Sequence, residues 1–145
     1  MTVTALYAGL LVPLYLFLTY RVILHRRGRR VDLGDGGDRL LQRYLRGHGN
    51  FAEYVPLGLL LLLLLEQGGW PSWLLHLSGL ALLGGRLAHA WSFSAAELRL
   101  PSRTAGMLLT MGMLAVAALL CLLQGLGPAG IRRAPRWRRC RRSPC

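Results

Sequence analysis

The sequence predicts an all-α integral membrane protein, a four-helix bundle with up-down-up-down order. More than half of its 145 residues are hydrophobic, and they stand in long blocks. Blocks of this kind suit a bilayer better than a soluble core. Four blocks joined by short polar connections favour antiparallel neighbouring helices. The predicted spans are Val3 to Leu24, Phe51 to Leu65 with a polar stretch upstream, Trp73 to Trp91, and Thr104 to Leu126.

The net charge of +12 comes entirely from arginine, because the chain contains no lysine. A soluble protein this basic would suggest a nucleic-acid partner. Here the arginines gather at the ends of apolar blocks, where they suit phospholipid headgroups and control orientation. We therefore expect a membrane protein that does not bind nucleic acid. Cys121, Cys140 and Cys145 lack the spacing of metal ligands, and we predict no metal site.

The first block is predicted to be a retained membrane span. No positive residue precedes it, and Arg21 and the basic run from His25 to Arg30 follow its apolar part. This order differs from that of a cleaved signal peptide. Two interpretations of Arg21 stay open: its side chain reaches out to lipid headgroups, or it points inward to a ligand carboxylate.

The second helix is predicted to run from Arg39 to about Gln67, with Asp38 of the Gly/Asp connector as its N-cap. Arg46, Asn50 and Glu53 are spaced so that they share one helical face. They stand where the chain enters its apolar block, and polar groups at that depth usually mark a site. A cation, an amide and a carboxylate in line suit a small zwitterionic ligand.

The third block carries Arg86 and His89, which are three residues apart. A histidine on an apolar face is more often structural than a ligand contact. A buried arginine, however, needs an acceptor, and we predict that Arg86 contacts Glu53.

The fourth helix is predicted to begin at Pro101 after a polar loop, with Arg103 in its first turn. Backbone amides at a helix N-terminus and a nearby arginine form an anion site, and an arginine there favours a thiolate. The alternative for Arg103 is a lipid headgroup contact.

We divide the chain into a membrane domain, residues 1–127, and a basic, disordered tail, residues 128–145. The arginines of the first and third connections place these loops in the cytoplasm by the positive-inside rule. Both termini then lie on the other side of the membrane, where the seven arginines of the tail conflict with that rule.

Three stretches resemble the MAPEG family, the membrane-associated proteins of eicosanoid and glutathione metabolism. The sequence RGHGNFAEYVP from Arg46 to Pro56 resembles the second-helix signature of the family. The sequences GRLAH (85–89) and LRLPSR (98–103) resemble its third helix and the start of its fourth. Gly106, Met107 and Thr110 resemble its bacterial branch. The resemblance covers residues 1 to about 127 and implies a homotrimer of four-helix bundles with glutathione as co-substrate between subunits.

Matching positions imply roles for individual residues. Glu53 would hold the glutathione ammonium, Arg46 and Asn50 its carboxylate or backbone groups, and Arg103 would be the catalytic residue that stabilises the thiolate. The remaining residues of the implied glutathione site are His89, Arg86, Arg21, Tyr54 and His48. One departure is Phe93, which stands where the family's enzymes often have a tyrosine.

The leading hypothesis is a membrane-bound glutathione transferase or peroxidase-like enzyme that conjugates or reduces lipophilic electrophiles, located in a bacterial inner membrane. Retention of Arg103 beside the second-helix motif favours it. The alternative is a non-enzymatic relative that binds lipid or a partner protein, and Phe93 favours this one. A purely structural membrane protein would leave the polar face of the second helix unexplained.

Overall fold

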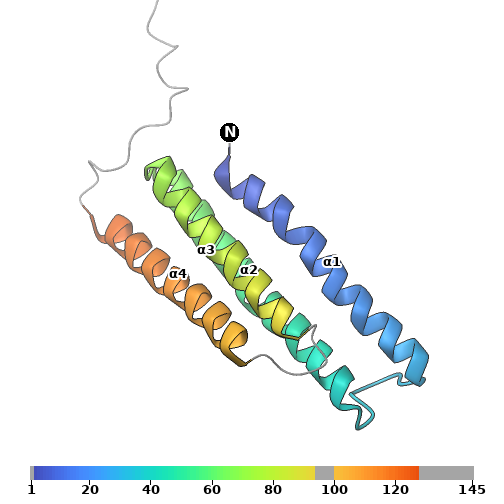
Figure 1. The fold of residues 1–145 in the computed structure, drawn as a ribbon. Helices are drawn as coiled ribbons and strands as arrows, with labels where there is room; N and C mark the ends of the chain where they lie inside the picture. The colour runs from blue at the N-terminus through green and yellow to red at the C-terminus, as the bar shows by residue number, and fades with distance from the viewer. Residues whose placement is uncertain (1, 94–99, 128–145) are drawn as a thin grey trace, which may run out of the picture.

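The computed structural model describes residues 2–93 and 100–127, and these residues form four α-helices in up-down-up-down order. The helices are α1 (Val3–Arg29), α2 (Arg39–Gln67), α3 (Ser72–Ser92) and α4 (Leu100–Leu126) (Figure 1). The predicted all-α bundle is confirmed, and α2 has the bounds that the sequence predicted. The predicted basic tail, residues 128–145, lies outside the described residues.

Helices α2 and α3 form the centre of the bundle, and α1 and α4 lie on opposite sides of this pair (Figure 1). The core is the seam between the four helices, to which α1 contributes Leu11, α2 Leu62, α3 Leu82 and α4 Ala117, all buried. Leucines on the outer faces are exposed. Such a distribution suits a bundle whose outer surface meets lipid.

Three of the helices, α1, α2 and α4, are long and apolar enough to cross a membrane. Within the described residues α3 does not join this set, although the sequence predicted a span there. Its 21 residues include Arg86, His76 and His89, which lower its hydropathy. Arg86 and His89 are both buried. Helix α3 therefore directs two of its polar groups into the bundle instead of toward lipid.

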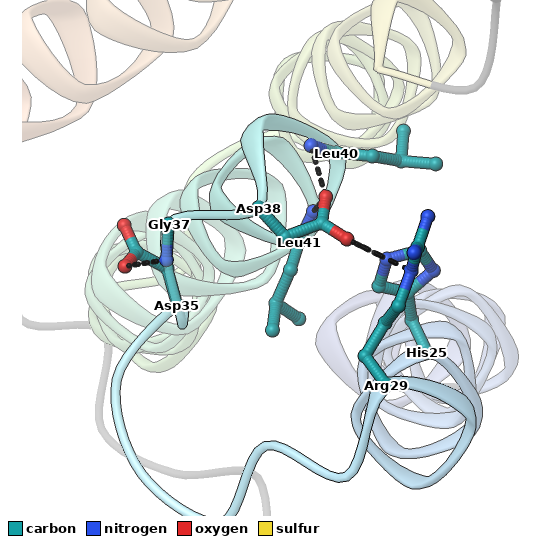
Figure 2. Close-up of polar contacts among 7 residues, drawn as sticks. All are labelled: His25, Arg29, Asp35, Gly37, Asp38, Leu40 and Leu41. Atoms are coloured by element: carbon teal, nitrogen blue, oxygen red, sulfur yellow. Dashed lines mark hydrogen bonds and ion pairs between the residues drawn. The ribbon is translucent and has the colours of Figure 1, made fainter.

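Asp38 joins α1 to α2 and is the N-cap that the sequence predicted. Its Oδ1 accepts hydrogen bonds from the Leu40 and Leu41 amides at 2.8 and 3.2 Å. Its Oδ2 lies 2.9 Å from His25 Nε2 and 3.2 Å from Arg29 Nε (Figure 2). The bond with His25, and then the bond from the Leu41 amide, lower the pKa of Asp38 from 3.8 to about 2.

A second carboxylate joins the same two helices at the opposite end of the bundle. Thr2, the N-cap residue of α1, makes no side-chain capping bond. Instead, the amides of Val3 and Thr4 donate to the two carboxylate oxygens of Glu66 at 2.6 and 3.0 Å. A carboxylate at a helix N-terminus satisfies free amides and faces the positive end of the helix dipole. The last turn of α2 therefore caps α1.

Candidate functional site

Arg46, Asn50 and Glu53 share one outer face of α2, as their spacing predicted. They line a shallow hollow of about 250 Å³, which we call the α2 groove. Arg46 and Glu53 are exposed, and Asn50 is half-buried with its Nδ2 donating to the Arg46 carbonyl at 3.0 Å. The complete lining is Gln42, Leu45, Arg46, Gly49, Asn50 and Glu53, all from α2.

The α2 groove presents opposite charges that are not neutralised within the chain as described. Both ion pairs found in residues 2–93 and 100–127 involve Asp38, so Glu53 has no ion-pair partner among these residues. An exposed carboxylate at the mouth of a membrane helix is costly unless a cation meets it. Glu53 is therefore available to a ligand ammonium. Arg46 lines the same groove and is available to an anionic group of the same ligand.

The predicted contact between Arg86 and Glu53 is wrong. The side chain of Arg86 is buried, with 1% exposed, and all its acceptors are neutral. Its Nε and Nη2 donate to Thr110 Oγ1 at 3.1 and 2.8 Å, and its Nη1 donates to the Asn50 carbonyl at 3.3 Å. Arg86 thus points into the bundle, whereas Glu53 points out of it.

The reach from Arg86 to Thr110 depends on a close approach of α3 and α4 at two glycines. A Cβ at Gly106 would lie 2.6 Å from the Gly85 carbonyl oxygen and 2.8 Å from the His89 amide nitrogen. A Cβ at Gly85 would lie 2.5 Å from Thr110 Oγ1. Neither position has room for a larger residue unless the helices move apart, so the glycines bring the two backbones into contact.

A second group of side chains surrounds Phe93 at the end of α3, and we call it the Phe93 cluster. Arg21 Nη2 donates to the Phe93 carbonyl at 3.0 Å. The Arg103 guanidinium carbon lies 5.5 Å from the centre of the Phe93 ring, and the His89 ring centre lies 5.0 Å from it. The Arg21 guanidinium also lies 4.1 Å over the Tyr44 ring, so its side chain points inward, and its predicted contact with a ligand carboxylate stays a prediction.

The α2 groove and the Phe93 cluster meet at the same level of α2. Gly47, next to Arg46 in the chain, is buried, and a Cβ there would lie 3.6 Å from the Phe93 ring. Tyr54 lies on the inner side of the groove, with its ring centre 5.5 Å from the Arg86 guanidinium carbon. Apart from His48, the predicted site residues of α2, α3 and α4 therefore gather at one end of the bundle, which is also the end of Asp38.

Arg86 and Tyr54 lie behind Asn50 and belong to neither group themselves, and His48 is the predicted site residue that lies away from both. Its Nε2 lies 3.1 Å from Thr19 Oγ1, and its ring packs against Tyr15 at 5.1 Å between centres. His48 therefore faces α1, on the other side of α2 from Arg46.

Thr110 was noted only for its resemblance to the bacterial branch of the family, and its contact with Arg86 was not predicted from the sequence. It is fully buried, accepts two bonds from Arg86 and donates to the Gly106 carbonyl at 2.9 Å. The available signal was a hydroxyl placed four residues after a glycine in the apolar middle of α4. In the described part of the chain, His, Cys, Asp and Glu side chains form no group of three that could hold a metal ion.

Comparison with known proteins shows the family of the chain. A family model described as the MAPEG family matches residues 4–123. The inner membrane protein YecN of Escherichia coli K12 is 42% identical over 91 residues, which cover 63% of this chain and 70% of YecN. YecN of Escherichia coli O6:H1 matches to the same extent. The predicted multi-pass location in a bacterial inner membrane is thereby confirmed. With a family model that spans all four helices, the chain belongs to the MAPEG family.

Proposed function

We propose that the protein is a membrane-bound glutathione transferase or peroxidase-like enzyme that conjugates or reduces lipophilic electrophiles. The observation that carries the proposal is the α2 groove, where Arg46, Asn50 and the unpaired Glu53 stand in line. Glutathione has two carboxylates and one ammonium group. In the proposed complex Glu53 holds the ammonium, and Arg46 and Asn50 hold a carboxylate and the peptide backbone.

Arg103 has the chemical role in this proposal. The thiolate, not the thiol, is the nucleophile, and an opposite charge within about 4–6 Å lowers a pKa by about 1–3 units. Arg103 is exposed at the first turn of α4 and beside the Phe93 ring, so its guanidinium is available to a ligand sulfur. In a transfer reaction the thiolate sulfur bonds to an electrophilic carbon, and the leaving group departs with its bonding electrons.

A second protein surface is part of the proposal. The α2 groove is lined by α2 alone, so a ligand seated in it keeps one open side. Charged side chains and a zwitterionic peptide are costly to expose to hydrocarbon. We propose that another copy of the chain covers this side and completes the site, in the homotrimer that the family resemblance implies.

The test is glutathione binding and turnover by the purified protein in detergent. Thiolate formation is followed in the ultraviolet during a glutathione titration, and an aryl halide then serves as a generic electrophile. We expect Arg103→Ala to lower turnover at least about tenfold, because the thiolate loses its counter-charge. Glu53→Ala should weaken glutathione binding about tenfold, as expected when a charged hydrogen bond is lost.

Arg27→Ala is the matched control, because it removes the same charge from an exposed position at the end of α1. It should leave both the dissociation constant and the turnover number unchanged. If the unaltered protein binds no glutathione at millimolar concentration, the transferase proposal fails.

A non-enzymatic role in lipid binding is the second candidate, and one observation favours it. An apolar groove of about 400 Å³ lies between α1 and α2, with Leu11, Tyr15, Phe51, Val55 and Leu59 in its lining. Its size and apolar lining suit an acyl chain. Binding of a fluorescent fatty acid without any binding of glutathione would favour this role over the enzyme.

A further inference from the structure

Arg86 is a permanently charged side chain buried at the centre of the bundle. An arginine does not lose its proton in proteins, so its burial must be compensated by acceptors. In residues 2–93 and 100–127 no carboxylate contacts it. Its partners are Thr110 of α4, the Asn50 carbonyl of α2 and the Met107 sulfur at 3.6 Å. The placement of this cation therefore depends on neutral groups.

Thr110 makes the two shortest of these contacts, and the direction of its hydrogen bonds is fixed. A guanidinium only donates, so the hydroxyl must accept both bonds from Arg86, at 3.1 and 2.8 Å. Its own hydrogen is then left for the Gly106 carbonyl at 2.9 Å. The single donor and both lone pairs of the hydroxyl are used. Thr110 consequently fixes two of the three nitrogens of Arg86 relative to the backbone of α4.

The third nitrogen of Arg86 connects this arrangement to the α2 groove. Nη1 donates to the carbonyl of Asn50, whose side chain lines the groove. The guanidinium also lies 5.5 Å from the centre of the Tyr54 ring on the next turn. A displaced guanidinium would remove this support from the inner side of the turn that carries Asn50.

We infer that Thr110 is a positioning residue for the ligand site, because it holds Arg86 against the Asn50 turn of α2. The inference rests on the proposed function, since the site it serves is the proposed glutathione site. Thr110 has 0% of its surface exposed and does not reach the α2 groove itself. Its effect on a ligand is therefore transmitted through Arg86.

The test compares Thr110→Val, which keeps the shape and removes the hydroxyl, with Thr110→Ser, which keeps the hydroxyl. Both are made in the full chain and titrated with glutathione in detergent. We expect Thr110→Val to raise the dissociation constant and KM for glutathione about tenfold, the scale of a hydrogen bond to a charged group. Because Arg103 is untouched, kcat and the thiolate absorbance at saturation should stay within about twofold. Thr110→Ser should restore the affinity.

A double-mutant cycle tests whether the effect is transmitted through Arg86. Arg86→Met removes the buried charge, so Thr110→Val leaves no unpaired cation in this background. The double variant should therefore fold even if Thr110→Val alone does not. In the Arg86→Met background, Thr110→Val should have no further effect on glutathione affinity. An equal loss in both backgrounds, or a lower melting temperature with unchanged affinity, would overturn the inference.

A measurement without ligand separates this inference from the proposed function. Amide hydrogen exchange of residues 46–54 should become faster in Thr110→Val and remain at the normal rate in Thr110→Ser. If the normal protein binds no glutathione but exchange responds in this way, the proposed function fails while the positioning of the α2 turn stands. If exchange in residues 46–54 is the same in both variants, the positioning itself is refuted.

Discussion

Replacing Gly106 by alanine tests whether the close contact of α3 and α4 holds the bundle together. A Cβ at Gly106 would lie 2.6 Å from the Gly85 carbonyl oxygen and 2.8 Å from the His89 amide nitrogen, whereas ordinary contacts begin at 3.4 Å. Both obstructing atoms belong to the backbone, so no side-chain rotation relieves the overlap. The two helices must separate by several tenths of an ångström or more.

Gly112 provides a matched control on the same helix. A Cβ there would meet nothing within 4 Å. Both substitutions gain the same intrinsic helix preference of alanine over glycine, about 1 kcal/mol in water. Overpacking at Gly106 costs about 1–3 kcal/mol. Since the preference cancels between the two variants, Gly106→Ala should be less stable than Gly112→Ala by about 1–3 kcal/mol.

The assay is reversible unfolding of the two variants in mixed micelles of increasing denaturing detergent, with helicity followed by circular dichroism. The free energies of unfolding are compared under identical conditions. If Gly106→Ala is as stable as Gly112→Ala, the contact between the glycines does not constrain the bundle. The hydrogen bond between Arg86 and Thr110 would then not depend on the close approach of α3 and α4 at these glycines.

Two predictions concern the carboxylates that join α1 to α2. The pKa of Asp38, at about 2, lies below its usual 3.8, so its stabilising effect should be complete above about pH 4 and disappear as the pH falls toward 2. In melting curves from pH 5 to 2, Asp38→Asn should remove this pH dependence and Asp35→Asn should retain it. Glu66→Gln should weaken the start of α1 by about 0.5–1 kcal/mol, because a charged cap at a helix N-terminus is lost. Faster hydrogen exchange of the Val3 and Thr4 amides in Glu66→Gln would reveal the weakened start of α1. Exchange at the normal rate would contradict the prediction.

Local patterns were sufficient to predict the helices and the shared face of Arg46, Asn50 and Glu53 on α2. Asp38 marks the start of α2 because a carboxylate before an apolar-periodic run is a good N-cap. The spacing of Arg46, Asn50 and Glu53 determines that they share a face, whatever surrounds the helix. The same rule explains the position of His48. It is two residues from Arg46, and residues at that spacing do not face each other.

The acceptors of Arg86 could not be predicted from local patterns. Glu53 was the nearest carboxylate in the second-helix motif, and pairing of opposite charges made it the reasonable choice. The observed acceptors are a hydroxyl from α4 and a backbone carbonyl from α2. They come within reach because Gly85 and Gly106 let two helices touch. Such an arrangement arises from tertiary packing. A single sequence shows the residues involved but not which of them meet in the folded bundle.

The charges gathered at this end of the bundle also discriminate between the two candidate ligands. Arg46, Arg86 and Arg103 lie in or beside the two groups, with Glu53 as the acidic member of the α2 groove. A neutral lipid would bring no anionic group to Arg46 or Arg103, whereas the glutathione thiolate would bring two carboxylates and a negative sulfur together with its one ammonium. An anionic phospholipid headgroup without an amine, such as phosphatidylglycerol, would also bring negative charge to the arginines, but it offers no cation to Glu53, whose exposed carboxylate would then be a repulsive neighbour. The change in affinity on replacing Glu53 is therefore the most informative single number: we expect glutathione to lose affinity, whereas an anionic lipid without an amine should gain it.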